Sequence, residues 1–310
     1  MSERPKVLVI CGPTATGKTA AAVEAALMLD GEVVSADSMQ IYRGMDIGTA
    51  KPTEAEKKGV PHHMIDILDP SESYSAARYK EDAYAVINDI ISRGKTPILA
   101  GGTGQYISAV TENLAYGDVP ENAELRARLN AEAAEKGGAA MLSRLAAVDP
   151  DAAAKLHEND LRRIVRALEI YELTGVTRTE FDRRSRLAPP LYDFAVFGLN
   201  YGERADLYER IDARVDKMLE EGLLSEAKSF YGKPLSHTAA QAIGYKELFE
   251  YFDGKTDLDT AVENIKRGSR RYAKRQLTWF SPMDVRWYDM KNASPRLAAE
   301  DMAKRFKAGE

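Results

Sequence analysis

The sequence predicts an α/β protein in which a parallel sheet is interrupted by an all-helical insertion domain. Short β-branched segments alternate with helical segments in the first hundred residues, a pattern typical of βαβ units. Residues 118–175 then carry helical patterns without a convincing strand, and another apolar strand pattern follows at 193–199. We therefore expect an α/β core over residues 1–117 and 192–310, with the insertion over residues 118–191.

Three strands are predicted in the first part of the core, each a short apolar segment. They cover residues 6–11, 32–36 and 97–100. Helices are predicted over residues 20–29 and 76–93, and Gly31 ends the first of them. Because the carboxyl ends of parallel strands meet at one edge of a sheet, residues that follow these strands are candidates for a ligand site.

The insertion is predicted to carry a helix over residues 160–174, with Asn159 as N-cap and Gly175 at its end. The helix is amphipathic, because apolar and basic side chains lie on opposite faces. The apolar face holds Leu161, Ile164, Val165 and Leu168, and the basic face holds Arg162, Arg163 and Arg166. The polar residues 176–190 are predicted to form a linker.

Two helices are predicted after the strand at 193–199, over residues 204–221 and 258–280. The second is notable for its charge, because no acidic residue falls between Asn264 and Met283. Its basic residues are Lys266, Arg267, Arg270, Arg271, Lys274 and Arg275. Exposed helix faces usually mix both signs of charge, so this face, with Tyr272 and Trp279 nearby, favours a polyanion over a merely solvated surface.

Composition narrows the class of protein. The 310 residues include 43 basic and 48 acidic side chains, a net charge of −5, so a nucleic-acid surface would have to be local. A single cysteine, Cys11, and four histidines exclude a disulfide framework and a cysteine-based zinc site. No segment approaches the ~18 apolar residues of a membrane helix, and the N-terminus lacks a signal-peptide core. We expect a cytoplasmic protein.

Residues 12–19 match the P-loop pattern G-x4-G-K-T, between a predicted strand and a predicted helix. Glycines allow backbone N–H groups to turn towards one anion, and the helix N-terminus adds positive potential. Lys18 supplies a positive charge, and the hydroxyl of Thr19 can bind Mg²⁺. The expected diphosphate-binding residues of this loop are Gly12, Pro13, Thr14, Ala15, Thr16, Gly17, Lys18 and Thr19. The core is therefore expected to resemble the P-loop NTPases.

Other candidate site residues follow strands or lie on helices. Asp37 follows the second strand and could be a general base, a Mg²⁺ ligand or only a turn cap. Thr103 lies in the glycine-rich segment 101–104 and could aim a hydroxyl at the anion or simply complete a tight turn. Arg210 and Arg214, one helical turn apart, could clamp the anion or form ion pairs along their own helix.

Eight segments in order resemble the bacterial tRNA dimethylallyltransferases, also called tRNA isopentenyltransferases. The resemblance covers about the whole chain and is much more specific than a P-loop alone. Its segments are GPTATGKT at 12–19, DSMQIYR at 37–43, DIGTAKP at 46–52, HHMID at 62–66, GGTG at 101–104, NDLRR at 159–163, QAIGYK at 241–246 and YAKRQLTWF at 272–280.

The resemblance implies transfer of a dimethylallyl group from dimethylallyl diphosphate to the amine of the adenine just 3′ of the tRNA anticodon. It implies that Asp37 is the general base, that Thr103 holds a diphosphate oxygen, and that Mg²⁺ assists. Arg210 or Arg214 would complete the anion site. The tRNA anticodon stem-loop would contact Asp37, Ser38, Met39, Gln40, Thr103, Arg126, Leu161, Arg162, Arg163, Arg166, Gln241, Gly244, Tyr245, Lys246, Arg267, Arg270, Arg271 and Lys274.

Three other functions share part of this pattern. A small-molecule or nucleotide kinase has a P-loop and a lid, but it does not need the basic helix at 258–280. A non-catalytic RNA-binding module does not need Asp37 and Thr103 beside a P-loop. An isopentenyltransferase for free adenine nucleotides does not need a basic insertion. The enzyme is expected to act as a monomer without an obligate protein partner.

Overall fold

The structure, a computed structural model, describes residues 4–115 and 122–309. The chain divides into two compact units. The core unit comprises residues 1–111 and 191–310, and the insertion unit comprises residues 112–190. The predicted start of the insertion, residue 118, lies outside the described residues.

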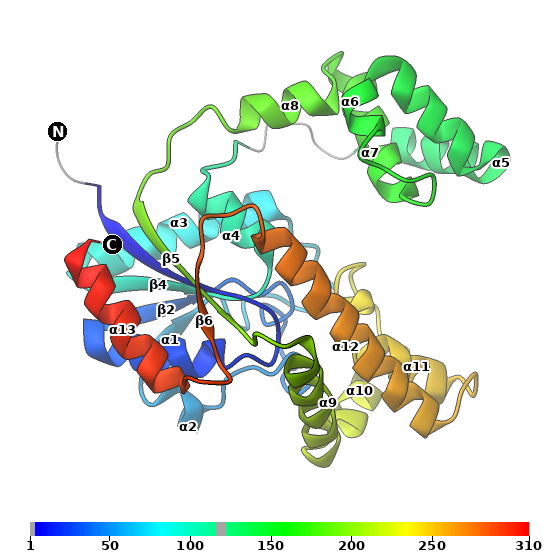
Figure 1. Ribbon diagram of the computed structural model, residues 1–310. Coiled ribbons are helices and arrows are strands. Elements are labelled where there is room, and N and C mark those ends of the chain that lie inside the picture. The colour runs from blue at the N-terminus through cyan, green and yellow to red at the C-terminus, as the bar shows by residue number, and fades with distance from the viewer. Residues whose placement is uncertain (1–3, 116–121, 310) are drawn as a thin grey trace. The chain divides into compact units, whose positions relative to one another are not determined.

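A parallel sheet of six strands forms the centre of the core unit, which confirms the predicted α/β class (Figure 1). Along the sheet the order is β3-β2-β4-β1-β5-β6. The strands are β1 (Lys6–Cys11), β2 (Gly31–Ser35), β3 (His62–His63), β4 (Thr96–Ala100), β5 (Asp193–Asn200) and β6 (Arg286–Asp289). The short edge strands β3 and β6 had no strand signal of their own, because each is only a few residues long.

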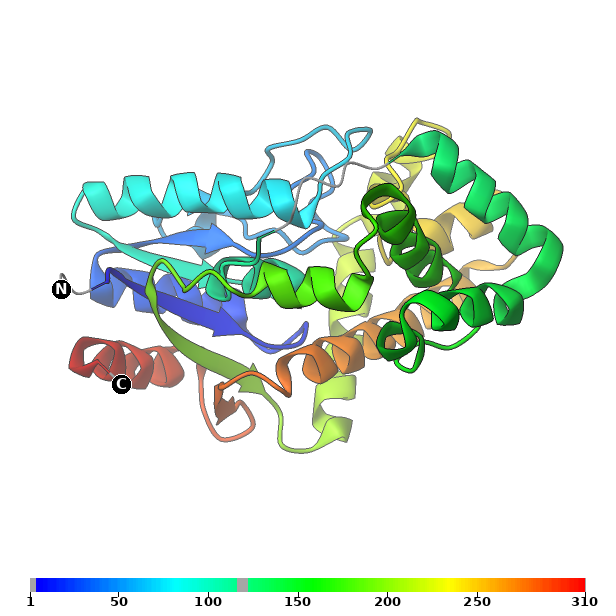
Figure 2. The same ribbon diagram turned by 90° about the horizontal axis from the view of Figure 1, so that it is seen from above.

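Helices cover both faces of the sheet, as Figure 2 shows for α3 and α13. Alternate residues of β1 supply the two sides: Leu8 and Ile10 pack with the helices α1 and α13, whereas Val7 and Val9 pack with α3 and α4. These helices are α1 (Lys18–Leu29), α3 (Ala76–Ser92), α4 (Gly104–Thr111) and α13 (Pro295–Ala308). The sequence left the last of these undefined, although its apolar face packs closely on α1.

A third apolar cluster joins the loop after β2 to the C-terminal helices. Ile41, Tyr42 and Met45 come from the loop, and Val215, Met218 and Ile265 come from the helices. The shorter segments of the core unit are α2 (Glu54–Lys57), α10 (Leu223–Phe230), a 3₁₀ turn (Ala239–Gln241) and α11 (Tyr245–Phe252). The remaining helices of the core unit are α9 (Arg204–Glu220) and α12 (Leu258–Phe280), close to their predicted bounds.

The described part of the insertion unit is helical, as predicted. Its helices are α5 (Ala123–Val148), α6 (Pro150–Ala153), α7 (Leu161–Thr174) and α8 (Arg178–Ser185). Gly137, with φ 80°, divides α5 into two helical segments. Two predictions are wrong: Asp160, and not Asn159, is the N-cap of α7, and the expected linker contains α8, which the side chain of Thr177 caps. No helix in the described ranges is long and apolar enough to cross a membrane.

Candidate active site

The P-loop joins β1 to α1 and is held closed by bonds to one carbonyl. The Thr16 hydroxyl and the Lys18 ammonium both donate hydrogen bonds to the Pro13 carbonyl, at 2.9 Å and 2.6 Å. Gly12 has φ 135°, and a Cβ there would lie 2.3 Å from the Leu199 carbonyl oxygen, so this position requires glycine. Ala15 also has a positive φ, 66°, which costs energy for a residue with a Cβ.

A cavity of about 390 Å³ opens beside this loop, and residues from the carboxyl ends of β1, β2 and β4 line it. Because these three strands are neighbours in the sheet, the loops that follow them converge. The predicted site residues among its lining are Thr14, Lys18, Thr19, Asp37, Ser38, Met39, Gln40, Arg214, Gln241, Gly244 and Lys246. Residues far apart in the sequence therefore form one pocket, as predicted for the edge of a parallel sheet.

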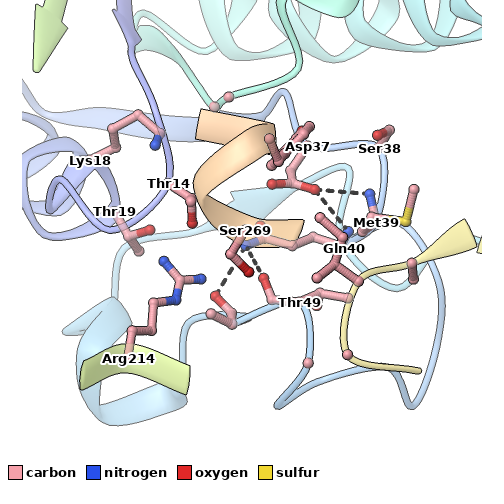
Figure 3. A pocket seen from close by; sticks show the side chains of 18 of the residues that line it. Thr14, Lys18, Thr19, Asp37, Ser38, Met39, Gln40, Thr49, Arg214 and Ser269 are labelled. Atoms are coloured by element: carbon pink, nitrogen blue, oxygen red, sulfur yellow. Dashed lines mark hydrogen bonds between the residues drawn. The ribbon is translucent and has the colours of Figure 1, made fainter. Parts of the chain in front are cut away.

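Lys18, Arg214 and Asp37 dominate the electrostatics of the pocket (Figure 3). Burial, followed by repulsion from Arg214, lowers the pKa of Lys18 to about 8, while Asp37 opposes the shift. Burial also lowers the pKa of Arg214, and Asp37 again opposes it. These two partly buried cations share one carboxylate, so an anion that enters the pocket relieves their repulsion. The arrangement is suited to a ligand that carries several negative charges.

Asp37 belongs to a tight turn and also faces the pocket. Its Oδ1 accepts hydrogen bonds from the backbone N–H groups of Met39, at 2.9 Å, and Gln40, at 3.4 Å. The turn-cap interpretation is therefore correct, but it does not exclude a chemical role, because the carboxylate has a second oxygen. Figure 3 shows this carboxylate in the same pocket as Lys18 and Arg214.

Thr103 lies behind Ser38. Its hydroxyl oxygen accepts a hydrogen bond from the Ser38 N–H at 3.0 Å, and the hydroxyl groups of Thr103 and Ser38 lie 3.2 Å apart. The hydroxyl of Tyr272, a residue of α12 that lines the cavity, also lies against Thr103. Thr103 itself does not line the cavity described above. In this structure it therefore fixes the turn that carries Asp37 and Ser38.

The structure distinguishes Arg214 from Arg210, which the sequence could not. Arg214 lines the pocket with Lys18 and Asp37, whereas Arg210 is exposed and is not part of the lining. Both belong to α9. Arg214 lies on the side of this helix that faces the pocket, together with Ile211 and Val215, which also line it. The expectation that Arg210 belongs to the anion site is therefore not supported by its position.

Two residues expected to contact RNA are held within the protein instead. Tyr245 is fully buried and donates a hydrogen bond to Glu226 at 2.6 Å, so the predicted contact of its side chain with tRNA is wrong for this conformation. Gln40 lines the pocket, but its amide donates to the carbonyls of Thr49 and Ala50 and its oxygen accepts from Ser35. The Gln40 side chain is part of the pocket wall, whereas the Tyr245 ring lies against Gly48, a residue of that wall.

Glu226 of α10 organises the loop that closes this wall. Its carboxylate accepts hydrogen bonds from the N–H groups of Asp46, Ile47 and Gly48, at 2.9–3.0 Å, in addition to the Tyr245 hydroxyl. The sequence motif at 46–52 did not point to Glu226, because the residue lies about 180 positions away. Its role follows from tertiary packing alone.

Only some of the basic side chains of α12 are available to bind a ligand. Lys266 pairs with Asp216 at 2.6 Å, and Arg270 bridges Asp212 of α9 and Glu263. Pairing of these two residues corrects the prediction of one uninterrupted basic surface, because the carboxylates come from the neighbouring helix α9 and from Glu263, two turns earlier on α12. Arg267, Arg271 and Lys274 are exposed.

The arginines of the insertion unit fall into two groups. Arg126 and Arg166 donate to the fully buried carboxylate of Glu169, at 2.8 Å and 2.7 Å. Arg162 and Arg163, on α7, are exposed. Leu161 was placed on the apolar face by its spacing, yet it is 37% exposed, because it belongs to the first turn of α7.

Sequence reasoning missed Gln276 as a separate site residue. Its side chain, 5% exposed, bonds both to the P-loop at Thr14 and to Gly102 after β4. Two sequence signals included it: the segment at 272–280 that resembles the family, and its helical spacing, since Tyr272 and Gln276 are four residues apart and share the face that meets the pocket.

The pocket fits a magnesium ion that is held mainly by a ligand. Among the described residues there is no group of three or more His, Cys, Asp or Glu side chains that could hold a metal. Thr19 offers a hydroxyl in the cavity beside Lys18. Mg²⁺ is commonly bound by few protein groups together with substrate phosphates and water, so this donor set fits an ion that arrives with a diphosphate.

Comparisons with known proteins agree with this geometry. The family model described as IPP transferase matches residues 40–283. The tRNA dimethylallyltransferase of Geobacillus thermodenitrificans is 49% identical over 287 residues, which are 92% of this chain and 90% of that protein. The corresponding enzyme of Shouchella clausii is 45% identical and is matched over 100% of this chain and 99% of its own length.

Solved structures show the same fold. The tRNA isopentenylpyrophosphate transferase of Bacillus halodurans is 44% identical with a TM-score of 0.73, covering 99% of this chain and 97% of the other. A eukaryotic dimethylallyltransferase acting on tRNA is 30% identical with a TM-score of 0.81, covering 99% of this chain and 80% of the other. With its P-loop pocket and its match to the family over nearly the whole length, this chain belongs to the IPP transferase family and is a tRNA dimethylallyltransferase.

Proposed function

We propose that the chain transfers a dimethylallyl group from dimethylallyl diphosphate to the exocyclic amine of the adenine 3′-adjacent to the tRNA anticodon. The observation that supports this most directly is the pair of partly buried cations, Lys18 and Arg214, beside the single carboxylate of Asp37. The cations suit a diphosphate, and the carboxylate suits proton removal from an amine. Both lie in one cavity.

The diphosphate is the leaving group in this reaction. As the allylic C–O bond breaks, negative charge grows on the diphosphate oxygen. Lys18, Arg214 and the N–H groups of the P-loop at the N-terminus of α1 stabilise that charge. Thr19 would help to hold a Mg²⁺ ion, which would supply further charge neutralisation. We propose that Asp37 is the general base and not a ligand of Mg²⁺.

The acceptor amine completes the reaction. The amine nitrogen forms a C–N bond to the allylic carbon, and Asp37 takes up the proton that the nitrogen loses. An apolar wall formed by Val215, Met218, Ile243 and Ile265 gives the hydrocarbon group and the base a dry environment. Enzymes that act on a base generally extrude it, so we propose that the adenine reaches this cavity after leaving the anticodon stack.

We further propose that exposed basic residues hold the anticodon arm. On α12 they are Arg267, Arg271 and Lys274, and on α7 they are Arg162 and Arg163. Contacts to RNA phosphates position the substrate, whereas contacts to unstacked bases provide the choice of tRNA. We propose a cytoplasmic monomer, as its sequence predicts.

The decisive experiment is incubation with dimethylallyl diphosphate, Mg²⁺ and unfractionated tRNA, followed by mass analysis of the nucleosides. We expect a dimethylallyl-adenosine and an equal amount of released diphosphate. Asp37→Asn provides the matched control, since asparagine keeps the hydrogen bonds of the turn but cannot accept the proton. Replacement of dimethylallyl diphosphate by ATP should give no transfer, and release of ADP in step with product would favour a kinase instead.

A further inference from the structure

Gln276 connects helix α12 to two separate loops of the diphosphate pocket. Its Oε1 accepts a hydrogen bond from the N–H of Thr14 in the P-loop, at 2.9 Å. Its Nε2 donates to the carbonyl of Gly102, in the turn after β4, also at 2.9 Å. The three positions are 262 and 174 residues apart in the sequence, so only the fold brings them together.

The contact is tight on both sides. Gln276 is 5% exposed, and a Cβ added at Gly102 would lie 2.1 Å from its Nε2. One turn earlier on α12, Tyr272 lines the same cavity, and its hydroxyl lies against Thr103 and Gln276. A shift of α12 therefore moves the P-loop and the turn that carries Thr103 together.

The side chain chemistry at this position is specific. One amide accepts from a backbone N–H and donates to a backbone carbonyl at the same time, which neither a carboxylate nor a thioether can do. A buried backbone group that loses its partner is destabilised. Thr14 is part of the loop that faces the anion, so the direction of its N–H is set by α12 and not by the P-loop alone.

The opposite side of α12 carries the exposed residues Arg271 and Lys274. We propose that Gln276 is a positioning residue through which RNA bound on α12 sets the geometry of the diphosphate pocket. The proposal rests on the proposed function, because it requires RNA on α12 and a diphosphate at the P-loop. It predicts that binding of either substrate strengthens binding of the other, by the same factor in both directions.

The test measures binding of inorganic diphosphate with Mg²⁺ by calorimetry, with and without a saturating tRNA anticodon stem-loop. In the unaltered protein we expect the stem-loop to tighten diphosphate binding by a factor within about 5 to 150. In Gln276→Met and Gln276→Glu this factor should fall to below about 2-fold. The matched control is Thr278→Ala on the same helix, an exposed residue outside the pocket, which should keep the full factor.

A second variant keeps the proposal testable if the Gln276 variants do not fold. Gly102→Ala keeps glutamine at position 276 but forces its amide away from the Gly102 carbonyl, because the new Cβ would lie 2.1 Å from Nε2, so it should reduce the factor as well. A purely structural role would weaken both affinities equally and leave the factor unchanged, which would overturn the proposal. So would an unaltered protein that binds both substrates independently. A protein that binds neither substrate would overturn the proposed function along with the coupling.

Discussion

At the scale of single residues, the pocket depends on side chains that serve the backbone and the ligand together. Asp37 fixes its own turn through Oδ1, and Lys18 fixes the P-loop through the Pro13 carbonyl. Such residues are held in place before a ligand arrives, so little ordering remains to be done during the reaction. Substitutions that preserve the backbone contact can therefore separate chemistry from folding.

Asp37→Asn is expected to bind tRNA and diphosphate nearly normally but to turn over about 10²–10⁴-fold more slowly, the usual contribution of a general base. Asparagine Oδ1 can still accept from the Met39 N–H, so the turn should persist. Single-turnover kinetics at saturating substrates measures the effect. Turnover close to that of the unaltered enzyme would remove Asp37 from the mechanism.

Arg214→Ala should weaken binding of inorganic diphosphate strongly, because it removes the cation that lines the pocket together with Lys18. Arg210→Ala is the matched control, one turn away on α9 and exposed, and should change the affinity little. Titration calorimetry with Mg²⁺ compares the two variants. Equal losses would mean that the charge of the helix as a whole, and not the position of Arg214, determines affinity.

At the scale of elements, α12 combines two roles on two faces. Tyr272 and Gln276 face the pocket, and Arg271 and Lys274 face solvent. Its pairing with α9 through Lys266 and Arg270 explains how so basic a helix packs against the core. Some basic residues of α12 therefore form ion pairs with acidic side chains of α9, and the others are exposed and can bind a ligand.

The double variant Arg271→Ala/Lys274→Ala should bind tRNA more weakly, and the slope of log K against log salt should shrink by about 0.7–0.9 per lost phosphate contact. Diphosphate affinity without RNA should be unchanged. Lys266→Gln is the control on the same helix: it removes one positive charge, and this ammonium already pairs with Asp216. A salt titration in which the double variant keeps the full slope would show that this face does not contact RNA.

At the scale of the whole molecule, a buried carboxylate joins three elements at one edge of the sheet. Glu32 of β2 is 3% exposed and accepts from both terminal nitrogens of Arg93, which follows α3, at 2.5 Å and 2.7 Å. His63 of β3 lies 2.8 Å away. The arrangement links β2, β3 and α3 and gives the fold a dependence on acid.

The hydrogen bonds from Arg93, against the opposing effect of burial, lower the pKa of Glu32 from 4.5 to about 2. A depressed carboxyl pKa stabilises the fold above pH ~4.5, and this contribution is lost as the pH falls towards 2. The loss is about 3 kcal/mol of unfolding free energy, at 1.36 kcal/mol per pKa unit. Urea denaturation between pH 7 and pH 2.5 should show a smaller pH dependence for Glu32→Gln, and identical curves would contradict the assignment.

The sequence by itself determined the features that depend on neighbours along the chain. The P-loop, the buried strands and the bounds of α9 and α12 follow from local pattern, because backbone periodicity and glycine conformation act over a few residues. Tertiary structure alone decided which arginine enters the pocket, that Tyr245 is buried, and that Arg270 is paired. Tertiary structure also places Gln276 and Glu226 where their side chains bind the backbone of the pocket loops. Their backbone partners lie more than 150 positions away, and only packing of the folded chain selects them.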